Sequence, residues 1–120
     1  MRFQVSKARG QPILRQSHIA VVERNVWWYG HFETEPYEAG WASEALGFLH
    51  IIEAADAGAT IDLRVQISAD GIHWADEGSG ISGPIEAGLH YVRISHFGTW
   101  LRVTGTTQGR IKTIFSWSLK

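Results

Sequence analysis

The amino-acid sequence predicts an all-β protein, an antiparallel β-sandwich or jelly roll of about eight strands. Residues 60–68 alternate apolar and polar side chains, which is the period of a strand with one buried face. Residues 68–71 then supply turn chemistry, because Asp70 can bond its own backbone and Gly71 can adopt a positive φ. Thirteen glycines against three prolines, with turn signals at short spacing, extend this pattern along the chain.

The composition indicates a single globular domain and excludes several classes of protein. A chain of 120 residues with 44% hydrophobic content is long enough to bury one core. The net charge of −1 provides no long-range field, so we expect neither nucleic acid nor an anionic membrane as partner. Without cysteine there is no disulfide and no thiolate metal site. No apolar run resembles a signal peptide or a membrane span, which predicts a cytoplasmic or particle-associated protein.

The chain divides into a basic, flexible arm at residues 1–11 and one domain at residues 12–120. The expected strands cover residues 13–22, 26–32, 45–53, 60–68, 72–74, 89–96, 99–104 and 111–119. Turns are expected at residues 23–25 and 105–110, and longer loops at residues 33–43 and 75–88.

Two of these strands are apolar on both faces. In residues 26–32, Trp28 and Phe32 share one face with Val26, and Trp27, Tyr29 and His31 occupy the other. Such a strand is either covered on both sides or part of an interface. Residues 45–53, ALGFLHIIE, are also apolar on both faces, which favours a buried central strand.

The hairpin carries the pattern S-x-D-G-x-x-W, formed by Ser68, Asp70, Gly71 and Trp74. It resembles a hairpin of discoidin-like and other carbohydrate-binding modules, and of small sandwiches associated with bacteriophage tails or capsids. Residues 91–93 (YVR), 101–103 (LRV) and the alternating strand at 111–119 look like later strands of the same modules. The resemblance implies a sandwich fold in which Ser68, Asp70 and Gly71 form the structural turn. It implies no single function, because this fold hosts many activities.

Aromatic residues are the main candidates for ligand binding. Six tryptophans are many for this length, and tryptophan is enriched at binding surfaces. The acidic loop at 33–43 carries Tyr37 and Trp41, and the hairpin adds His73 and Trp74, which together predict a rim for stacking sugar rings. The alternative is that these rings cap the core, as we expect for Trp28 and Trp117.

Three arginines stand between apolar neighbours on expected strands: Arg64, Arg93 and Arg102. If the strands share a sheet, these side chains form a ladder on its outer face, suited to carboxylates, phosphates or a partner subunit. Alternatively each arginine pairs with a nearby acid such as Asp62 or packs over Trp100. The predicted interface comprises Trp27, Tyr29, Arg64, Arg93, Trp100 and Arg102.

No motif predicts catalysis, a metal or a cofactor. The six histidines contain no His-x-His pair, although histidines from different strands can converge in ways that sequence does not reveal. There is no cysteine nucleophile, no G-x-S-x-G and no phosphate-binding loop.

These observations favour a non-catalytic β-sandwich module that self-associates and docks on a larger particle or complex. A phage-type structural component is the most concrete version, and we expect a homo-oligomer, with a trimer favoured. The alternatives are a glycan-binding module that uses exposed Trp and Tyr residues, and a small jelly-roll metalloenzyme.

Overall fold

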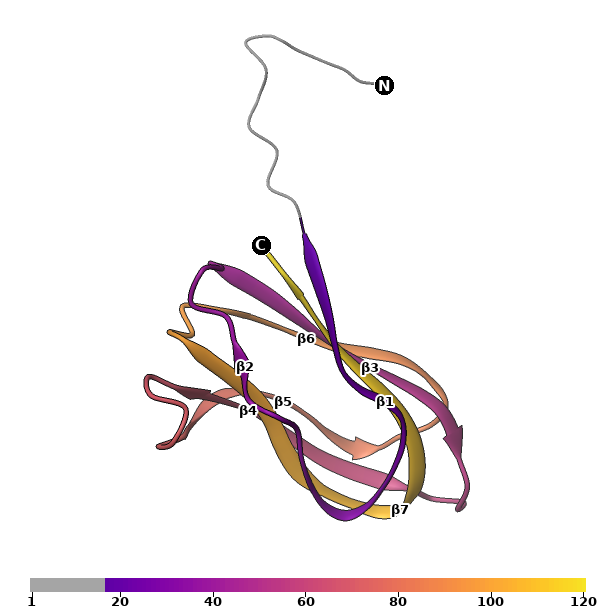
Figure 1. Ribbon diagram of the computed structural model, residues 1–120. Coiled ribbons are helices and arrows are strands. Elements are labelled where there is room, and N and C mark those ends of the chain that lie inside the picture. Colours follow the sequence, from indigo (N-terminus) through magenta and orange to yellow (C-terminus); the bar gives the residue numbers. More distant parts are fainter. Residues whose placement is uncertain (1–16) are drawn as a thin grey trace, which may run out of the picture.

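The computed structural model describes residues 17–120, which form one antiparallel sheet curled into a half-barrel (Figure 1). Its strands are β1 (His18–Glu33), β2 (Tyr37–Glu38), β3 (Glu44–Ala54), β4 (Thr60–Ser68), β5 (Ala75–Pro84), β6 (Gly88–Ser95) and β7 (Trp100–Leu119). The described residues contain no helix, so the all-β prediction is confirmed. The predicted arm at residues 1–11 and the start of the strand expected at residues 13–22 lie outside the described residues.

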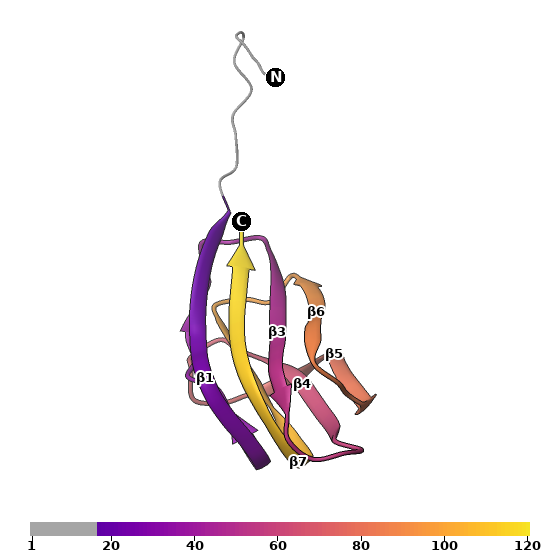
Figure 2. The ribbon, with the colours of Figure 1, turned by 90° about the vertical axis from the view of Figure 1, so that its right-hand side faces the viewer.

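Strand β7 is the backbone of the sheet, because four strands pair directly with it. One of its edges pairs with β1 from His18, opposite Leu119, to Glu33, opposite Thr104. Its other edge pairs with β4 along residues 100–108 and with β3 along residues 111–119. β5 then extends the sheet beyond β4, and β6 extends it beyond β3. Figure 2 shows β1, β7, β3 and β6 side by side, while β4 and β5 form the other branch.

The two branches diverge where β7 bends at Gly109, whose φ is +89°. Next to it, Asp56 in the β3–β4 turn accepts a hydrogen bond from the backbone N–H of Arg110 at 2.8 Å. The guanidinium of Arg110 also grips the Asp56 carboxylate, with Nε and Nη2 at 3.2 and 3.0 Å. These hydrogen bonds lower the pKa of Asp56 to about 2, and those from the Arg110 side chain contribute most. The clamp therefore ties the connection between the branches to the bend of the strand that they share.

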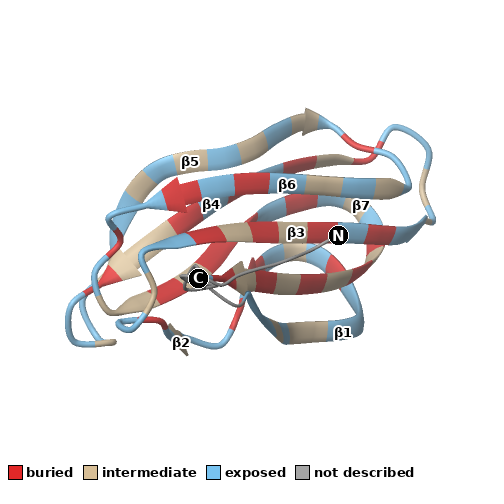
Figure 3. Cartoon of the chain, turned by 90° about the horizontal axis from the view of Figure 1, so that it is seen from above, coloured by how far each residue is buried: buried red, intermediate tan, exposed pale blue. Residues whose placement is uncertain are grey.

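The core lies inside the curl, between the two branches. Alternate residues of the central strands point into it, and Figure 3 shows buried positions alternating with intermediate or exposed ones along β3 and the end of β6. Phe115 and Trp117 are fully buried and meet edge to face, with ring centroids 5.1 Å apart. Gly47 on β3 makes room for them, because a Cβ there would lie 2.9 Å from both rings. Trp28 is also buried, so the assignment of Trp28 and Trp117 to the core is confirmed.

The strands expected at 99–104 and 111–119 are one continuous strand, and the described part of the strand expected at 13–22 joins that expected at 26–32 in β1. Because β2 was not expected, the described residues contain seven strands instead of about eight. The turn predicted at residues 105–110 is wrong. Thr106 and Thr107 keep their ladder partners on both sides, opposite β1 and β4. Two glycines in this segment mimic a turn signal, but Gly109 bends the strand without ending it, and Gly105 fits where a Cβ would collide with the Asp62 carbonyl.

Two other predicted irregular segments are also strands. The loop expected at 75–88 is largely β5, which pairs with β4 although its glycines at 78 and 83 have positive φ. The return of the hairpin therefore begins at residue 75, after the 72–74 segment that was expected to supply it. The turn expected at 23–25 is a bulge within β1, where Asn25 has a φ of 55°. A second register shift follows Trp28, and Val26 is more exposed than Trp28 and Phe32.

The bend at Gly109 predicts a large effect of a small substitution. Gly109→Ala should lower the free energy of unfolding by about 1–2 kcal/mol, because a side chain disfavours positive φ and the new Cβ would press on Ala59 at 3.2 Å. Urea unfolding measures the change. Gly40→Ala is the control, because Gly40 lacks a positive φ and its Cβ would meet mainly the flexible end of Glu38. Equal losses in both variants would contradict the role assigned to the bend.

The Asp56–Arg110 clamp predicts an acid-sensitive fold. Because the folded pKa of Asp56 is below its ordinary value, the clamp stabilises the protein fully above about pH 4 and loses this effect between about pH 4 and pH 2. The midpoint temperature of thermal unfolding should therefore fall less steeply for Asp56→Asn than for the unmodified protein as the pH is lowered over this range. Glu86→Gln, which removes an exposed carboxylate with no ion pair in residues 17–120, should retain the full acid sensitivity. Parallel curves for Asp56→Asn and the unmodified chain would refute the prediction.

Candidate interaction surface

The outer surface of the β1-β7-β4-β5 part of the sheet is polar and internally paired. Charged and amide side chains from four strands stand there in neighbouring register positions. We call this surface the polar face; it consists of Glu33, Asp62, Arg64, Gln66, Asp76 and Arg102.

The side chains of the polar face form one continuous chain of contacts. Arg102 Nη1 lies 3.0 Å from Glu33 Oε2, and Arg102 Nε donates to Gln66 Oε1 at 2.8 Å. Gln66 Nε2 donates to Asp76 Oδ1 at 2.9 Å, and Arg64 Nη1 lies 3.6 Å from Asp76 Oδ2. Each charge is therefore balanced by a partner on this same face, and nothing in the arrangement requires an external ligand.

Arg102 is held more tightly than a docking residue would be. Its guanidinium lies 4.2 Å from the ring centroid of Trp74, and its side chain is only 16% exposed. The stack covers one face of Trp74, which was predicted to bind sugar rings. Arg102 and Trp74 thus contact one another, and the guanidinium acts as a bridge between β7 and the end of the hairpin.

The hairpin turn is a compact set of hydrogen bonds. Ser68 Oγ accepts from the backbone N–H groups of Asp70 and Gly71 at 3.2 and 2.8 Å. Asp70 Oδ1 accepts from the N–H groups of Ile72 and His73, both at 2.8 Å, and Oδ2 lies 2.7 Å from His73 Nδ1. Hydrogen bonds hold the pKa of Asp70 far below its usual value. The largest contribution comes from the backbone N–H of His73, followed by the His73 ring and the N–H of Ile72. Gly71, with a φ of +79°, packs on the ring of Trp100.

The outer surface of the β1-β7-β3-β6 part of the sheet has the opposite character. Phe48 on β3 lies between Tyr91 on β6 and Ser116 on β7, and Val21 on β1 is the next residue across. Neighbouring rows add further aliphatic and aromatic side chains, together with His50 between Leu89 and Ile114, and Lys112 between Trp27 and Glu53. We call this surface the uncovered face; it consists of Ile19, Val21, Trp27, Leu46, Phe48, Ile52, Leu89, Tyr91 and Ile114.

Six of these nine side chains are exposed although they are large and hydrophobic. Their exposed fractions run from 38% for Ile52 to 63% for Leu89. Contiguous apolar surface of this kind is uncommon on a monomeric protein and marks sites of interaction. Trp27, one of the predicted interface residues, belongs to this group, whereas Tyr29 projects at the bulge that follows it.

The apolar pattern of β3 is visible in the sequence, but only one of the two faces that it predicted to be buried is covered. Residues 45–53 were expected to be covered on both faces, and β3 does lie between β7 and β6. Its inner residues, such as Leu49, are buried, but Phe48 and Ile52 face a side that no part of residues 17–120 covers. The mismatch between a two-sided apolar strand and a one-sided cover is the main functional signal in this molecule.

The three predicted interface arginines do not form one ladder. Arg64 and Arg102 belong to the polar face, where Arg64 also lies 3.5 Å from Asp62. Arg93 is on β6, at the border of the uncovered face, opposite Leu46. Its guanidinium lies 5.6 Å from the ring centroid of Tyr91, and within residues 17–120 it has no carboxylate partner. Only Arg93 of the three is therefore placed to meet a partner on the uncovered face.

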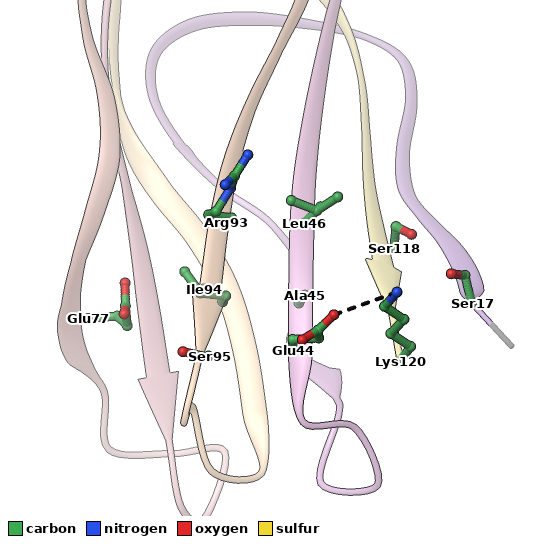
Figure 4. A pocket seen from close by; sticks show the side chains of 10 residues that line it. All are labelled: Ser17, Glu44, Ala45, Leu46, Glu77, Arg93, Ile94, Ser95, Ser118 and Lys120. Carbon is green, nitrogen blue, oxygen red and sulfur yellow. Dashed lines mark ion pairs between the residues drawn. The ribbon is translucent and has the colours of Figure 1, made fainter. Parts of the chain in front are cut away.

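A shallow groove of about 580 Å³ crosses one end of the uncovered face (Figure 4). It runs from Glu77 on β5, past Arg93 and Leu46, to Ser17 before β1. Lys120 Nζ lies 3.7 Å from Glu44 Oε1, and Glu77 accepts the N–H of Ser79 at 3.0 Å. Because its acidic and basic groups balance, the groove selects no ligand by charge alone.

The four residues of the predicted glycan rim do not form one site. Tyr37 pairs with β7 at Leu101, on the edge of β7 that β1 also uses. His73 and Trp74 follow β4, which pairs with the opposite edge. Trp41 remains exposed, with its ring edge-on to His18 at 5.8 Å.

The described part of the chain contains neither a metal-binding cluster nor a membrane-spanning helix. No three His, Asp or Glu side chains of residues 17–120 gather closely enough to hold a metal ion. None of those residues belongs to a helix of the length and apolarity needed to cross a membrane.

The packing of Arg102 predicts a structural role. Arg102→Lys should lower the free energy of unfolding by about 1–2 kcal/mol, because an ammonium group cannot stack on Trp74 while bonding both Glu33 and Gln66. Arg93→Lys, on the exposed border of the uncovered face, is the control and should leave stability within about 0.5 kcal/mol. Chemical denaturation of both variants measures this difference, and equal stability would show that the bridge is unimportant.

Comparison with known proteins adds no family to these observations: no protein-family model, curated protein or solved structure matches the chain. The resemblance of the hairpin to those of carbohydrate-binding and phage-associated modules therefore stays a prediction. The uncovered face has to be interpreted from its own residues.

Proposed function

We propose that this domain is a non-catalytic structural module that self-associates through the uncovered face and docks on a larger protein assembly. The observation that carries the proposal is β3, whose sequence is apolar on both faces while the chain's described residues cover only one. An apolar face on a central strand is stable in water only at a cost, which a partner removes by covering it.

The size of the uncovered face is suited to an interface. Its six exposed side chains together present on the order of 600 Å², the upper end of what a monomer usually leaves uncovered. The half-buried Leu46, Phe48 and Ile114 add to this area. A standard protein interface buries roughly 800 Å² on each partner, so the whole face is of the required size.

The polar face supports the same interpretation by contrast. Its arginines are balanced by Glu33, Asp62 and Asp76, which suits a surface that stays in water. The concrete form of the proposal is a phage-type particle component, for which the hairpin resemblance is the support. Two branches closed over a shared core also suit the sandwich or jelly-roll architecture of such modules.

The glycan-binding alternative receives less support from the geometry. One face of Trp74 is occupied by Arg102, and Trp74 and Tyr37 lie on opposite sides of β7. Of the three aromatic rings Tyr37, Trp41 and Trp74 in the predicted rim, only Trp41 is exposed. The metalloenzyme alternative has no residue cluster in residues 17–120 to support it.

Solution mass tests the proposal. Light scattering on a sizing column should give a multiple of the 13.4 kDa chain, and raised salt should leave that mass unchanged because the contact is apolar. Leu89→Lys and Ile19→Lys, on opposite edges of the uncovered face, should each shift the protein to the mass of one chain while circular dichroism remains that of a folded β-protein.

The matched control is Thr106→Lys, an exposed strand position on the other branch of β7, which should keep the assembled mass. A single-chain mass for the unmodified protein at micromolar concentration would overturn self-association. Dissociation by Thr106→Lys and not by Leu89→Lys would contradict the proposal, because it would place the interface on the branch of the sheet that contains the polar face.

A further inference from the structure

We infer that the occupant of the uncovered face is a second copy of this chain that presents the same face, so that the unit of assembly is a two-fold pair. This inference rests on the proposed function and specifies its geometry. It replaces the expectation of a trimer with an even number of chains.

The first reason is that the described residues offer only one extended apolar surface. Of their ten exposed large hydrophobic side chains, six belong to the uncovered face. The other four lie at separate places along the chain: Val26, Tyr29, Trp41 and Ile72. A ring or a filament joins two different patches, whereas a two-fold pair joins a patch to itself. A single patch is therefore matched best by its own copy.

The second reason is the distribution of charge on the face. The central row, from Val21 through Ser116 and Phe48 to Tyr91, contains no charged side chain. Arg93 lies towards one end of the strands. A two-fold axis that crosses the strands at the central row would place the Arg93 end of β6 over the partner's Leu89 end. Arg93 thus avoids its own counterpart, and Lys112, further along β7, stands opposite Glu53, which supplies its counter-charge.

The third reason lies in the side chains of the central row. Ser116 is the one small residue in the row and stands between Val21 and Phe48. About the axis described above, each residue of this row faces its own counterpart, so Phe48 meets the partner's Phe48 ring and Ser116 lies beside the partner's Ser116.

A single introduced cysteine tests the pair directly, because the chain contains no cysteine of its own. Ser116→Cys changes one atom at the centre of the face, and a residue near a two-fold axis lies close to its own counterpart. Treatment with a short bismaleimide should give covalent dimers at a yield at least about tenfold above that of a control, because paired thiols have effective concentrations in the millimolar range. The control is Ser82→Cys, an exposed serine on β5, opposite Asp62.

The outcomes separate this inference from the proposed function. Efficient cross-linking at Ser116, with masses equal to even numbers of chains, supports the pair. An assembled mass with odd stoichiometry, or with cross-linking at Ser116 no greater than at Ser82, overturns the pair and leaves the proposed function intact. A single-chain mass for the unmodified protein and for both variants overturns both, and directs attention to a different protein as occupant of the face.

Discussion

The structure depends on β7, the strand to which every other strand is attached directly or through one neighbour. β7 pairs with β1 along one edge and with β4 and then β3 along the other, so its bend determines where the sheet divides. Positive φ at Gly109 permits this bend, and the Asp56–Arg110 contacts fasten the β3–β4 turn beside it. Because both branches leave the same strand at the same point, the core between them is fixed by local backbone geometry as well as by the packing of Phe115 and Trp117.

The division of β7 also explains how one sheet carries two unlike outer surfaces. The branch through β4 places Arg64 and Gln66 beside residue 102, and the charges neutralise each other across strands. The branch through β3 places Phe48 beside Tyr91 and Ser116, with no charged side chain among them. The two surfaces are formed by the same alternation of side chains. On the polar face the charged groups pair with one another, whereas on the uncovered face the apolar side chains have no cover from residues 17–120.

Much of the fold could be predicted from the sequence wherever alternation and turn chemistry agreed. The strand at 60–68 and the turn that follows it were recognised because apolar period, Ser68, Asp70 and Gly71 all favour a hairpin. Glycine misled the prediction in β5 and in the middle of β7, since it serves equally in a turn, a bulge and a close approach between strands. The pairing of Arg102 with Glu33 joins residues far apart in sequence, so no local pattern could reveal it. The uncovered face was similarly hidden, because an apolar strand does not show which of its sides the chain itself will cover.

The bulges in β1 have a consequence for how such a molecule can associate. Among the described residues β1 pairs only with β7, so its other edge presents backbone groups to solvent. Register shifts around Glu23 and after Trp28, with Asn25 in a left-handed conformation, break this edge into short lengths that cannot continue a ladder in a neighbouring molecule. Growth by strand addition, the route to fibrils, is thereby obstructed along the longest free edge. On the proposal that the uncovered face joins two copies, the interrupted edge would let the protein reach high concentration as closed pairs instead of fibrils.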